Sequence, residues 1–338
     1  MSELVKIVQF HEAGGPEVLS VDTLPLPEPG PGEARLRVKA IGLSYGEIMF
    51  RKDEYYVSPS FPARNGYEAS GVVEAVGPGV DPALVGQIRS TVPAFSLTDY
   101  GVYGEVAIVP AELLAPYPEH LSFEEGASIW MQYITAWGAL VHHAAIAPGD
   151  FVVMTAAAGS VGPGAIQIVK AEGGIPIAIT RSAAKRDRLL ELGAAHVIVT
   201  DEEPDLTARI LEITGGVGAK VIFDSVGGPA IADLAMATAD DALIIVYGLL
   251  SNQVPAFPIY EAWRLGAQRR SFKMMGYSVF GVTLVPQLRE QAVRYVYDKI
   301  KGGQLKPRIA KTFALADIVE AHRYMERSEQ VGKIVVTV

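Results

Sequence analysis

Cysteine is absent from the 338 residues of this sequence. A chain without thiols forms no disulfides, offers no thiolate ligands to zinc and has no cysteine nucleophile. Disulfides are rare in cytosolic proteins, so the absence is consistent with a reducing compartment. We therefore expect a cytoplasmic protein.

Positive charge is also scarce, because 29 lysines and arginines stand against 38 aspartates and glutamates, for a formal net charge of −9. An acidic chain without a basic run is a poor partner for nucleic acid or an anionic membrane. No apolar run reaches the about 18 residues that a membrane-spanning helix requires. Residues 1–8 alternate polar and apolar side chains, which argues against a signal peptide. We therefore predict neither a nucleic-acid partner nor a membrane partner.

Hydrophobic patterning divides the chain into two kinds of segment. Residues 5–10 and 34–40 alternate polar and apolar side chains, which is typical of antiparallel strands with one wet face. From residue 150 onward, continuous apolar runs such as 151–154 and 243–246 alternate with helix-like segments, a rhythm that predicts βαβ units. We predict an α/β fold with a Rossmann doubly wound parallel sheet and a second, β-rich domain.

We place the Rossmann dinucleotide-binding domain at residues 125–271 and the β-rich domain at 1–124 and 272–338. The stretch 124–143 has the composition of a helix. The terminal segment 332–338 reads as a strand that returns to the first domain.

A glycine-bearing turn follows the first buried strand. Ala157, Gly159 and Gly162 occupy the three positions of G-x-G-x-x-G, where the second glycine admits a pyrophosphate and the third allows close helix packing. Pro163 suits the first turn of the following helix, whose free N–H groups favour a phosphate. A generic strand–turn–helix corner is the alternative. The residues expected to face the phosphate are Gly159, Ser160, Val161 and Gly162.

The end of the second strand indicates which dinucleotide is bound. An NAD-binding domain places a carboxylate there to hold the ribose 2′-OH, whereas this chain has Thr180 and Arg181. Ser182 and Lys185 add a hydroxyl and a second cation, a set that can hold a 2′-phosphate. The alternative is a solvated basic helix start, although extra positive charge is unfavourable at a helix N-terminus. We predict NADPH as the cofactor.

Other apparent chemical signals are weaker. Residues 42–46 match the G-x-S-x-G elbow around Ser44, but that elbow needs a buried parallel strand before it. The alternation of Arg35, Arg37 and Lys39 predicts a half-exposed strand instead. The six histidines show no metal-ligand spacing, so we predict no metal site.

Residues 11–19, 66–77, 156–162, 224–228 and 332–335 resemble motifs of the medium-chain dehydrogenase/reductase superfamily. Within it, the chain is similar to the zinc-independent quinone oxidoreductases and enoyl reductases. The resemblance implies that the β-rich domain is a GroES-like catalytic domain and that the protein is an NADPH-dependent oxidoreductase. The implied reaction is hydride transfer to an α,β-unsaturated carbonyl compound or a quinone.

By motif position, the catalytic zinc ligands of the superfamily's zinc enzymes are replaced here by Ser44, Tyr67 and Met131. None of the three suits zinc in this setting, so a Lewis-acid mechanism is unavailable. In the family's enoyl thioester reductases a tyrosine precedes the Glu of the G-x-E motif by thirteen residues, and counting back from Glu68 reaches Tyr55. The resemblance makes Tyr55 the candidate acid, with a loop or pocket-lining tyrosine as the alternative.

The resemblance also places residues beside the nicotinamide and an interface between subunits. Relatives commonly dimerise through the edge strands of their nucleotide-binding sheets, for which residues 243–247 or the stretch near Phe272 are candidates. A zinc-free ketone or aldehyde reductase, a low-turnover NADPH-binding protein and a specialised biosynthetic reductase remain alternative functions. The residues expected near the nicotinamide are Thr135, Tyr247, Gly248 and Leu249.

Overall fold

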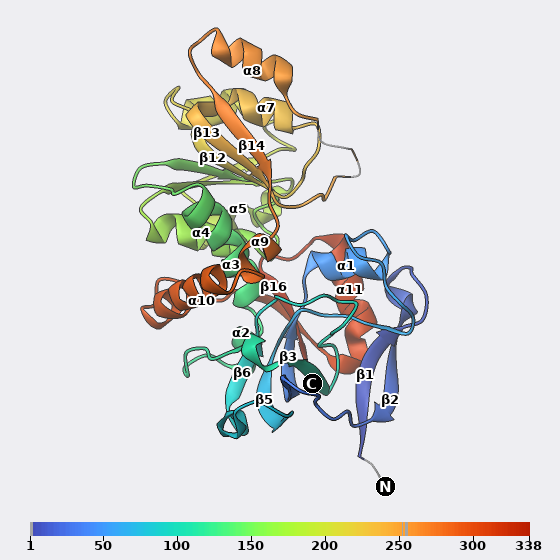
Figure 1. The fold of residues 1–338 in the computed structure, drawn as a ribbon. Helices are drawn as coiled ribbons and strands as arrows, with labels where there is room; N and C mark the ends of the chain where they lie inside the picture. The colour runs from blue at the N-terminus through green and yellow to red at the C-terminus, as the bar shows by residue number, and fades with distance from the viewer. Residues whose placement is uncertain (1–2, 252, 254–255) are drawn as a thin grey trace. The chain divides into compact units, whose positions relative to one another are not determined.

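The computed structural model describes residues 3–251, 253 and 256–338 (Figure 1). The chain forms two compact units. Unit 1 comprises Met1–Met131, Thr283–Gly302 and Pro307–Val338, and unit 2 comprises Gln132–Val282 and Gly303–Lys306. Unit 2 therefore extends past the expected boundary at residue 272, because residues 272–276 form a strand of its sheet.

Unit 2 contains a six-stranded sheet with the order β11-β10-β9-β12-β13-β14, and each neighbouring pair is parallel. This order is that of the Rossmann fold, in which the first and fourth strands lie at the centre and ligands bind beyond their carboxyl ends. The predicted fold class is confirmed. The strands are β9 (Phe151–Met154), β10 (Ile175–Thr180), β11 (His196–Val199), β12 (Ala219–Asp224), β13 (Thr238–Val246) and β14 (Phe272–Gly276).

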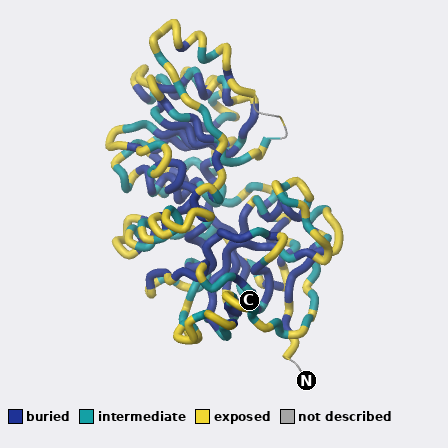
Figure 2. Tube along the Cα trace, viewed as in Figure 1, coloured by how far each residue is buried: buried dark blue, intermediate teal, exposed yellow. Residues whose placement is uncertain are grey.

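The strands of unit 2 are apolar because helices leave little of the sheet exposed to water. Val153, Ile222 and Ile244 are fully buried in one core, and Figure 2 shows the dark-blue strands of this sheet. The helices are α3 (Trp130–Trp137), which begins in unit 1, the π-helix Gly138–His143, α4 (Gly162–Ala171), α5 (Arg186–Glu191), α6 (Leu206–Ile213), α7 (Ile231–Met236), α8 (Ile259–Gly266) and α9 (Phe280–Thr283), with a 3₁₀ turn at Ala183–Lys185.

Unit 1 is β-rich, as predicted. A sheet of order β2-β1-β4 accompanies a larger one of order β15-β16-β3-β5-β6-β8, in which β7 also pairs with β3. The strands are β1 (Leu4–Phe10), β2 (Leu19–Pro25), β3 (Glu33–Gly42), β4 (Ala63–Arg64), β5 (Glu68–Val76), β6 (Ile88–Thr91), β7 (Val106–Pro110), β8 (Leu114–Ala115), β15 (Ile309–Ala314) and β16 (Lys333–Thr337). The helices are α1 (Tyr45–Arg51), α2 (Phe123–Gly126), α10 (Pro286–Lys301) and α11 (Ile318–Arg327), with 3₁₀ turns at Pro16–Val18, Pro82–Leu84, Ala111–Leu113 and Leu315–Asp317.

The C-terminal strand β16 pairs antiparallel with β3, which confirms the predicted return to the first domain. Strand β3 itself is more buried than its charge alternation suggested, because Arg35 is only 7% exposed and pairs with Glu74. Its antiparallel pairing with β5 and β7 is incompatible with the parallel strand of a hydrolase elbow.

Two other expectations are corrected. Residues 243–247 are no sheet edge, because β14 pairs with residues 242–246 and itself forms the edge. The helix expected over 124–143 is divided into α2, α3 and the π-helix. The division arises because the Glu68 carboxylate accepts the backbone N–H groups of Ile129 and Trp130 and so caps the start of α3.

Candidate functional site

The turn between β9 and α4 has the close packing that its glycine motif predicted. A Cβ atom on Gly162 would lie 1.9 Å from the carbonyl oxygen of Ala157, so only glycine fits at this third position. Ala156, in the same turn, has a positive φ of 44°, which lies in the left-handed region of backbone conformation. The turn is also tied to the next strand, since Ala157 donates its N–H to the carbonyl of Ile179 at 3.0 Å.

Free backbone donors gather where α4 begins. Among the residues that the structure describes, no acceptor takes the N–H groups of Ser160 or Val161. Both lie directly before the first helical residue, Gly162. Unpaired N–H groups and the positive end of a helix dipole favour an anion such as a phosphate. The turn therefore fits the pyrophosphate of a dinucleotide.

The end of β10 presents a hydroxyl and a guanidinium. Thr180 is buried, Arg181 is exposed, and no hydrogen bond or ion pair engages the Arg181 side chain within the described ranges. Ser182 accepts the N–H of Ala184 at 3.3 Å, and Lys185 is partly buried in the following 3₁₀ turn. An uncommitted guanidinium at this strand end suits a 2′-phosphate better than a 2′-hydroxyl.

A polar clamp joins the ends of β9 and β12. The Thr155 hydroxyl donates to Asp224 Oδ1 at 2.5 Å, and Asp224 also accepts the N–H groups of Val226 and Gly227. The Ser225 N–H in turn donates to the Thr155 hydroxyl at 2.9 Å. Because both of its carboxylate oxygens accept hydrogen bonds, Asp224 stabilises the loop after β12 and is not a candidate catalytic acid. We did not predict this clamp, although both residues stand where a buried strand ends.

The candidates beyond β13 are held against this clamp. The Tyr247 ring stacks on Phe223 with centroids 3.9 Å apart, and its side chain hydrogen-bonds Ser225, while burial raises the pKa of its hydroxyl. A Cβ atom on Gly248 would meet the carbonyl oxygen of Ser225 at 2.7 Å. Leu249 is 54% exposed and Thr135 is buried on α3. Tyr247, Gly248 and Leu249 thus follow the carboxyl end of β13, the strand beside β12.

In unit 1, Tyr55 belongs to a cluster of aromatic side chains. Its ring lies 4.5 Å from that of Tyr56, and its hydroxyl would be 3.2 Å from a Cβ atom on Gly46. Burial raises the pKa of the Tyr55 hydroxyl, and a hydrogen bond with Tyr67 partly offsets this effect. Tyr55 is therefore protonated at neutral pH, where a tyrosine of ordinary pKa also keeps its proton.

A network of charged residues contacts Ser44 and Tyr67, two of the three residues that the resemblance places at the zinc-ligand positions. Lys333 Nζ lies 2.9 Å from Ser44 Oγ and 2.9 Å from Glu68 Oε2. Glu47 accepts the N–H groups of Ser44 and Tyr67 at 2.7 and 3.0 Å. In the described part of the chain, no group of three His, Asp or Glu side chains could hold a metal ion.

A buried chain of hydrogen bonds extends from Glu47. The Tyr103 hydroxyl donates to Glu47 at 2.6 Å and lies 3.1 Å from His322 Nε2. His322 Nδ1 contacts Arg51, which also pairs with Glu326. We did not predict these contacts, because the partners lie up to 275 positions apart in the sequence.

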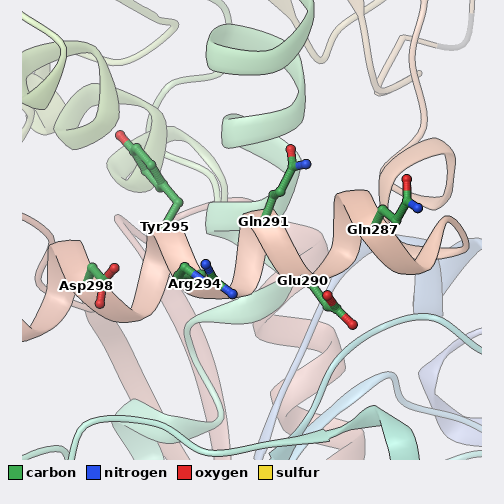
Figure 3. Close-up of a pocket in the computed structure, with 6 residues that line it drawn as sticks. All are labelled: Gln287, Glu290, Gln291, Arg294, Tyr295 and Asp298. Atoms are coloured by element: carbon green, nitrogen blue, oxygen red, sulfur yellow. The ribbon is translucent and has the colours of Figure 1, made fainter.

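A hollow in the surface of unit 1 lies elsewhere. About 400 Å³ of space runs beside α10 and is lined by polar residues (Figure 3). No residue predicted for the site lines it. The lining residues are Gln287, Glu290, Gln291, Arg294, Tyr295 and Asp298.

Two family models match the chain. The model for the alcohol dehydrogenase GroES-like domain covers residues 30–119, and one described as zinc-binding dehydrogenase covers residues 192–336. The first match agrees with the β-rich architecture of unit 1. No helix among the described residues is long and apolar enough to cross a membrane.

Named relatives match over nearly the full length. A quinone oxidoreductase of Salmonella typhimurium is 32% identical over 324 residues, 94% of this chain and 95% of that protein. A 2-haloacrylate reductase of Burkholderia is 29% identical over 336 residues, 98% of each chain.

Solved structures agree with these matches. Escherichia coli quinone oxidoreductase complexed with NADPH has a TM-score of 0.87 at 27% identity, covering 98% of this chain and 100% of that one. An NAD-dependent alcohol dehydrogenase has a TM-score of 0.85 at 32% identity, with 98% and 99% covered. The chain belongs to the quinone oxidoreductase-like, zinc-independent family of the medium-chain dehydrogenase/reductase superfamily.

Proposed function

We propose that this protein is an NADPH-dependent, zinc-independent reductase that transfers hydride to an α,β-unsaturated carbonyl compound or a quinone. Arg181 directly follows β10, is exposed and makes no side-chain hydrogen bond or ion pair within the described ranges. No carboxylate stands at this strand end. This observation carries the choice of NADPH as the cofactor. The names of the quinone oxidoreductase and 2-haloacrylate reductase relatives support the substrate class.

The residues of unit 2 fit the cofactor. Ser160 and Val161 would donate N–H groups to the pyrophosphate, Gly159 and Gly162 would allow its approach, and Arg181 would pair with the 2′-phosphate. When bound, NADPH supplies the hydride. Further candidate contacts are Thr180, Ser182 and Lys185 at the adenosine end and Thr135, Tyr247, Gly248 and Leu249 at the nicotinamide end.

Unit 1 would supply the proton. Tyr55 is protonated at neutral pH, as a tyrosine of ordinary pKa also is, and burial raises the pKa of its hydroxyl further. After hydride addition, an enolate needs one proton at its α-carbon to yield the saturated carbonyl compound, and a reduced quinone likewise needs one to yield the hydroquinone. We propose that Tyr55 hydrogen-bonds the carbonyl oxygen or delivers such a proton.

Reduction of a ketone or aldehyde is the second candidate, and it is favoured by the structural similarity to an alcohol dehydrogenase. NADPH oxidation with 2-cyclohexenone separates the two reactions. Enone reduction yields cyclohexanone, whereas carbonyl reduction yields 2-cyclohexenol, and gas chromatography resolves them. Tight NADPH binding without turnover across enones, quinones and ketones would instead indicate a binding protein.

We further propose that the protein is a cytoplasmic homodimer formed through β14. Among the described residues this strand pairs with β13 alone, so its other edge offers backbone groups to a second copy. Sedimentation should give about twice the 36.1 kDa chain mass. Hydrogen exchange in residues 272–276 should slow as protein concentration rises, and concentration-independent exchange with a monomer mass would refute this interface.

A further inference from the structure

We propose that Lys333 is a positioning residue that holds the Ser44 hydroxyl as a hydrogen-bond donor to the carbonyl oxygen of the substrate. The inference rests on the proposed reductase function and deepens it. It names the group that stabilises charge on the substrate in a family member without zinc.

The contacts of Lys333 define the direction of the Ser44 hydroxyl. Lys333 Nζ lies 2.9 Å from Ser44 Oγ, and an ammonium can only donate hydrogen bonds. Ser44 Oγ is therefore the acceptor in this contact, which turns the serine proton away from Lys333. Among the described residues no acceptor takes the Ser44 hydroxyl proton. No described acceptor therefore competes with a ligand for that proton.

The Lys333 ammonium is held in a fixed position by a buried ion pair. Lys333 and Glu68 are fully buried and form an ion pair at 2.9 Å. Glu68 is itself anchored, because its other oxygen accepts the N–H groups of Ile129 and Trp130 at 2.9 and 2.6 Å. A buried charge with a paired, hydrogen-bonded partner keeps a defined position.

The backbone around the ammonium leaves room for it. A Cβ atom on Gly42 would lie 2.7 Å from Lys333 Cε, so the stem of Lys333 crosses directly over this glycine. The Ser44 backbone is also held, since its N–H donates to Glu47 at 2.7 Å. The Ser44 hydroxyl and the Lys333 ammonium are therefore both held in position before a substrate binds.

The proposed reaction needs such a donor. When the β-carbon of an enone accepts hydride, the C=C electrons shift toward the carbonyl and negative charge develops on its oxygen. The nicotinamide is oxidised by two electrons and the enone is reduced by two, and the enolate then takes one proton at the α-carbon. A fixed donor at the developing oxyanion stabilises the transition state, and the hydroxyl is a stronger donor when its oxygen accepts from an ammonium.

The test compares Ser44→Ala, Lys333→Met and the double variant, with 2-cyclohexenone and 1,4-benzoquinone as probes. We expect each single variant to lower kcat by about 10²-fold, with the KM for NADPH unchanged because the cofactor candidates lie in unit 2. The double variant should be no slower than Lys333→Met, since both remove one interaction. Lys39→Met, at an exposed lysine on β3, should match the wild type.

A second readout distinguishes positioning from a structural role. The infrared carbonyl stretch of bound 2-cyclohexenone should shift to lower frequency in the wild type and return toward the solution value in Ser44→Ala. Should Lys333→Met fail to fold, the Glu68→Gln/Lys333→Met variant removes both buried charges together and carries the same expectation.

Two results would overturn the inference in different ways. A wild-type protein that oxidises NADPH with neither probe refutes the proposed function and the inference with it. An active wild type whose Ser44→Ala variant keeps its kcat and carbonyl frequency refutes only the role of Ser44 and Lys333.

Discussion

Nδ1 of His322 lies 2.7 Å from a guanidinium nitrogen of Arg51 in the interior of unit 1. Because the guanidinium only donates, Nδ1 must accept and the ring proton must sit on Nε2, which faces the Tyr103 hydroxyl at 3.1 Å. Tyr103 then donates to Glu47. The contact with Arg51 therefore fixes one tautomer of the neutral His322 ring. It also fixes the donor-to-acceptor direction of the hydrogen bonds from His322 through Tyr103 to Glu47.

The stability of the protein should depend on His322. Burial and the charge of Arg51 lower the pKa of His322 to about 3 from its ordinary 6.5. Between these values the unfolded chain binds a proton that the folded protein does not, so stability is lost as pH falls through this window. The contribution has a slope of at most about 1.4 kcal/mol per pH unit.

Urea unfolding of the wild type and His322→Gln from pH 4 to 7 measures this contribution. The wild-type free energy of unfolding should rise more steeply with pH, since the variant has no group to protonate there. Glu47, whose pKa burial raises, acts in the opposite sense in both proteins and cancels in the difference. Parallel stability curves would contradict the prediction.

Gly162→Ala should damage the dinucleotide turn. The new Cβ would meet the Ala157 carbonyl at 1.9 Å, so backbone must move and the melting temperature and NADPH affinity should both fall. Gly266→Ala is the control, because a Cβ there meets nothing within 4 Å. That helical position should gain stability, by about 0.5–1 kcal/mol. Unchanged NADPH binding in Gly162→Ala would exclude this turn as the phosphate site.

Arg181→Ala should raise the KM for NADPH far more than the KM for NADH. Loss of a charge-assisted contact to the 2′-phosphate costs about 1.5–3 kcal/mol, or about 10- to 150-fold. Arg188→Ala is a matched control, since Arg188 is also exposed and lies nearby on α5. Equal effects of Arg181→Ala on the two cofactors would refute the preference.

Tyr55→Phe should lower kcat on an enone by about 10²-fold if its hydroxyl acts as the acid. Tyr56→Phe alters the neighbouring ring, which is 60% exposed, and should leave kcat near the wild-type value. Because burial raises the pKa of Tyr55, its ionisation should not appear in the rate profile below pH 10. A Tyr55→Phe variant with the wild-type rate would make this tyrosine a spectator.

Chelation should leave activity unchanged. The resemblance places Ser44, Tyr67 and Met131 at the zinc-ligand positions of zinc-dependent relatives, and no metal-binding group occurs within residues 3–251, 253 and 256–338. Prolonged dialysis against EDTA should therefore preserve NADPH oxidation, and elemental analysis should find no stoichiometric zinc. Loss of activity that added Zn²⁺ restores would contradict the zinc-free assignment.

The parallel sheet and its first turn could be predicted because their signals are local. The apolar run at 151–154 and the nearby Gly162 report burial and close packing within a short stretch of chain. The cluster around Lys333 could not be predicted, since a charged residue in a sequence is ordinarily read as exposed. Its partner Ser44 lies 289 positions away, and only the pairing of β16 with β3 brings the two together.

The same pairing sets an order of events during synthesis. Strand β16 follows all of unit 2 in the chain, so the sheet of unit 1 lacks this strand while unit 2 is being made. Ser44 and Glu68 therefore lack their contacts with the Lys333 ammonium until residues 333–337 have been synthesised. Unit 2 is therefore synthesised in full before β16, and the contacts of Lys333 with Ser44 and Glu68 require a strand made after it.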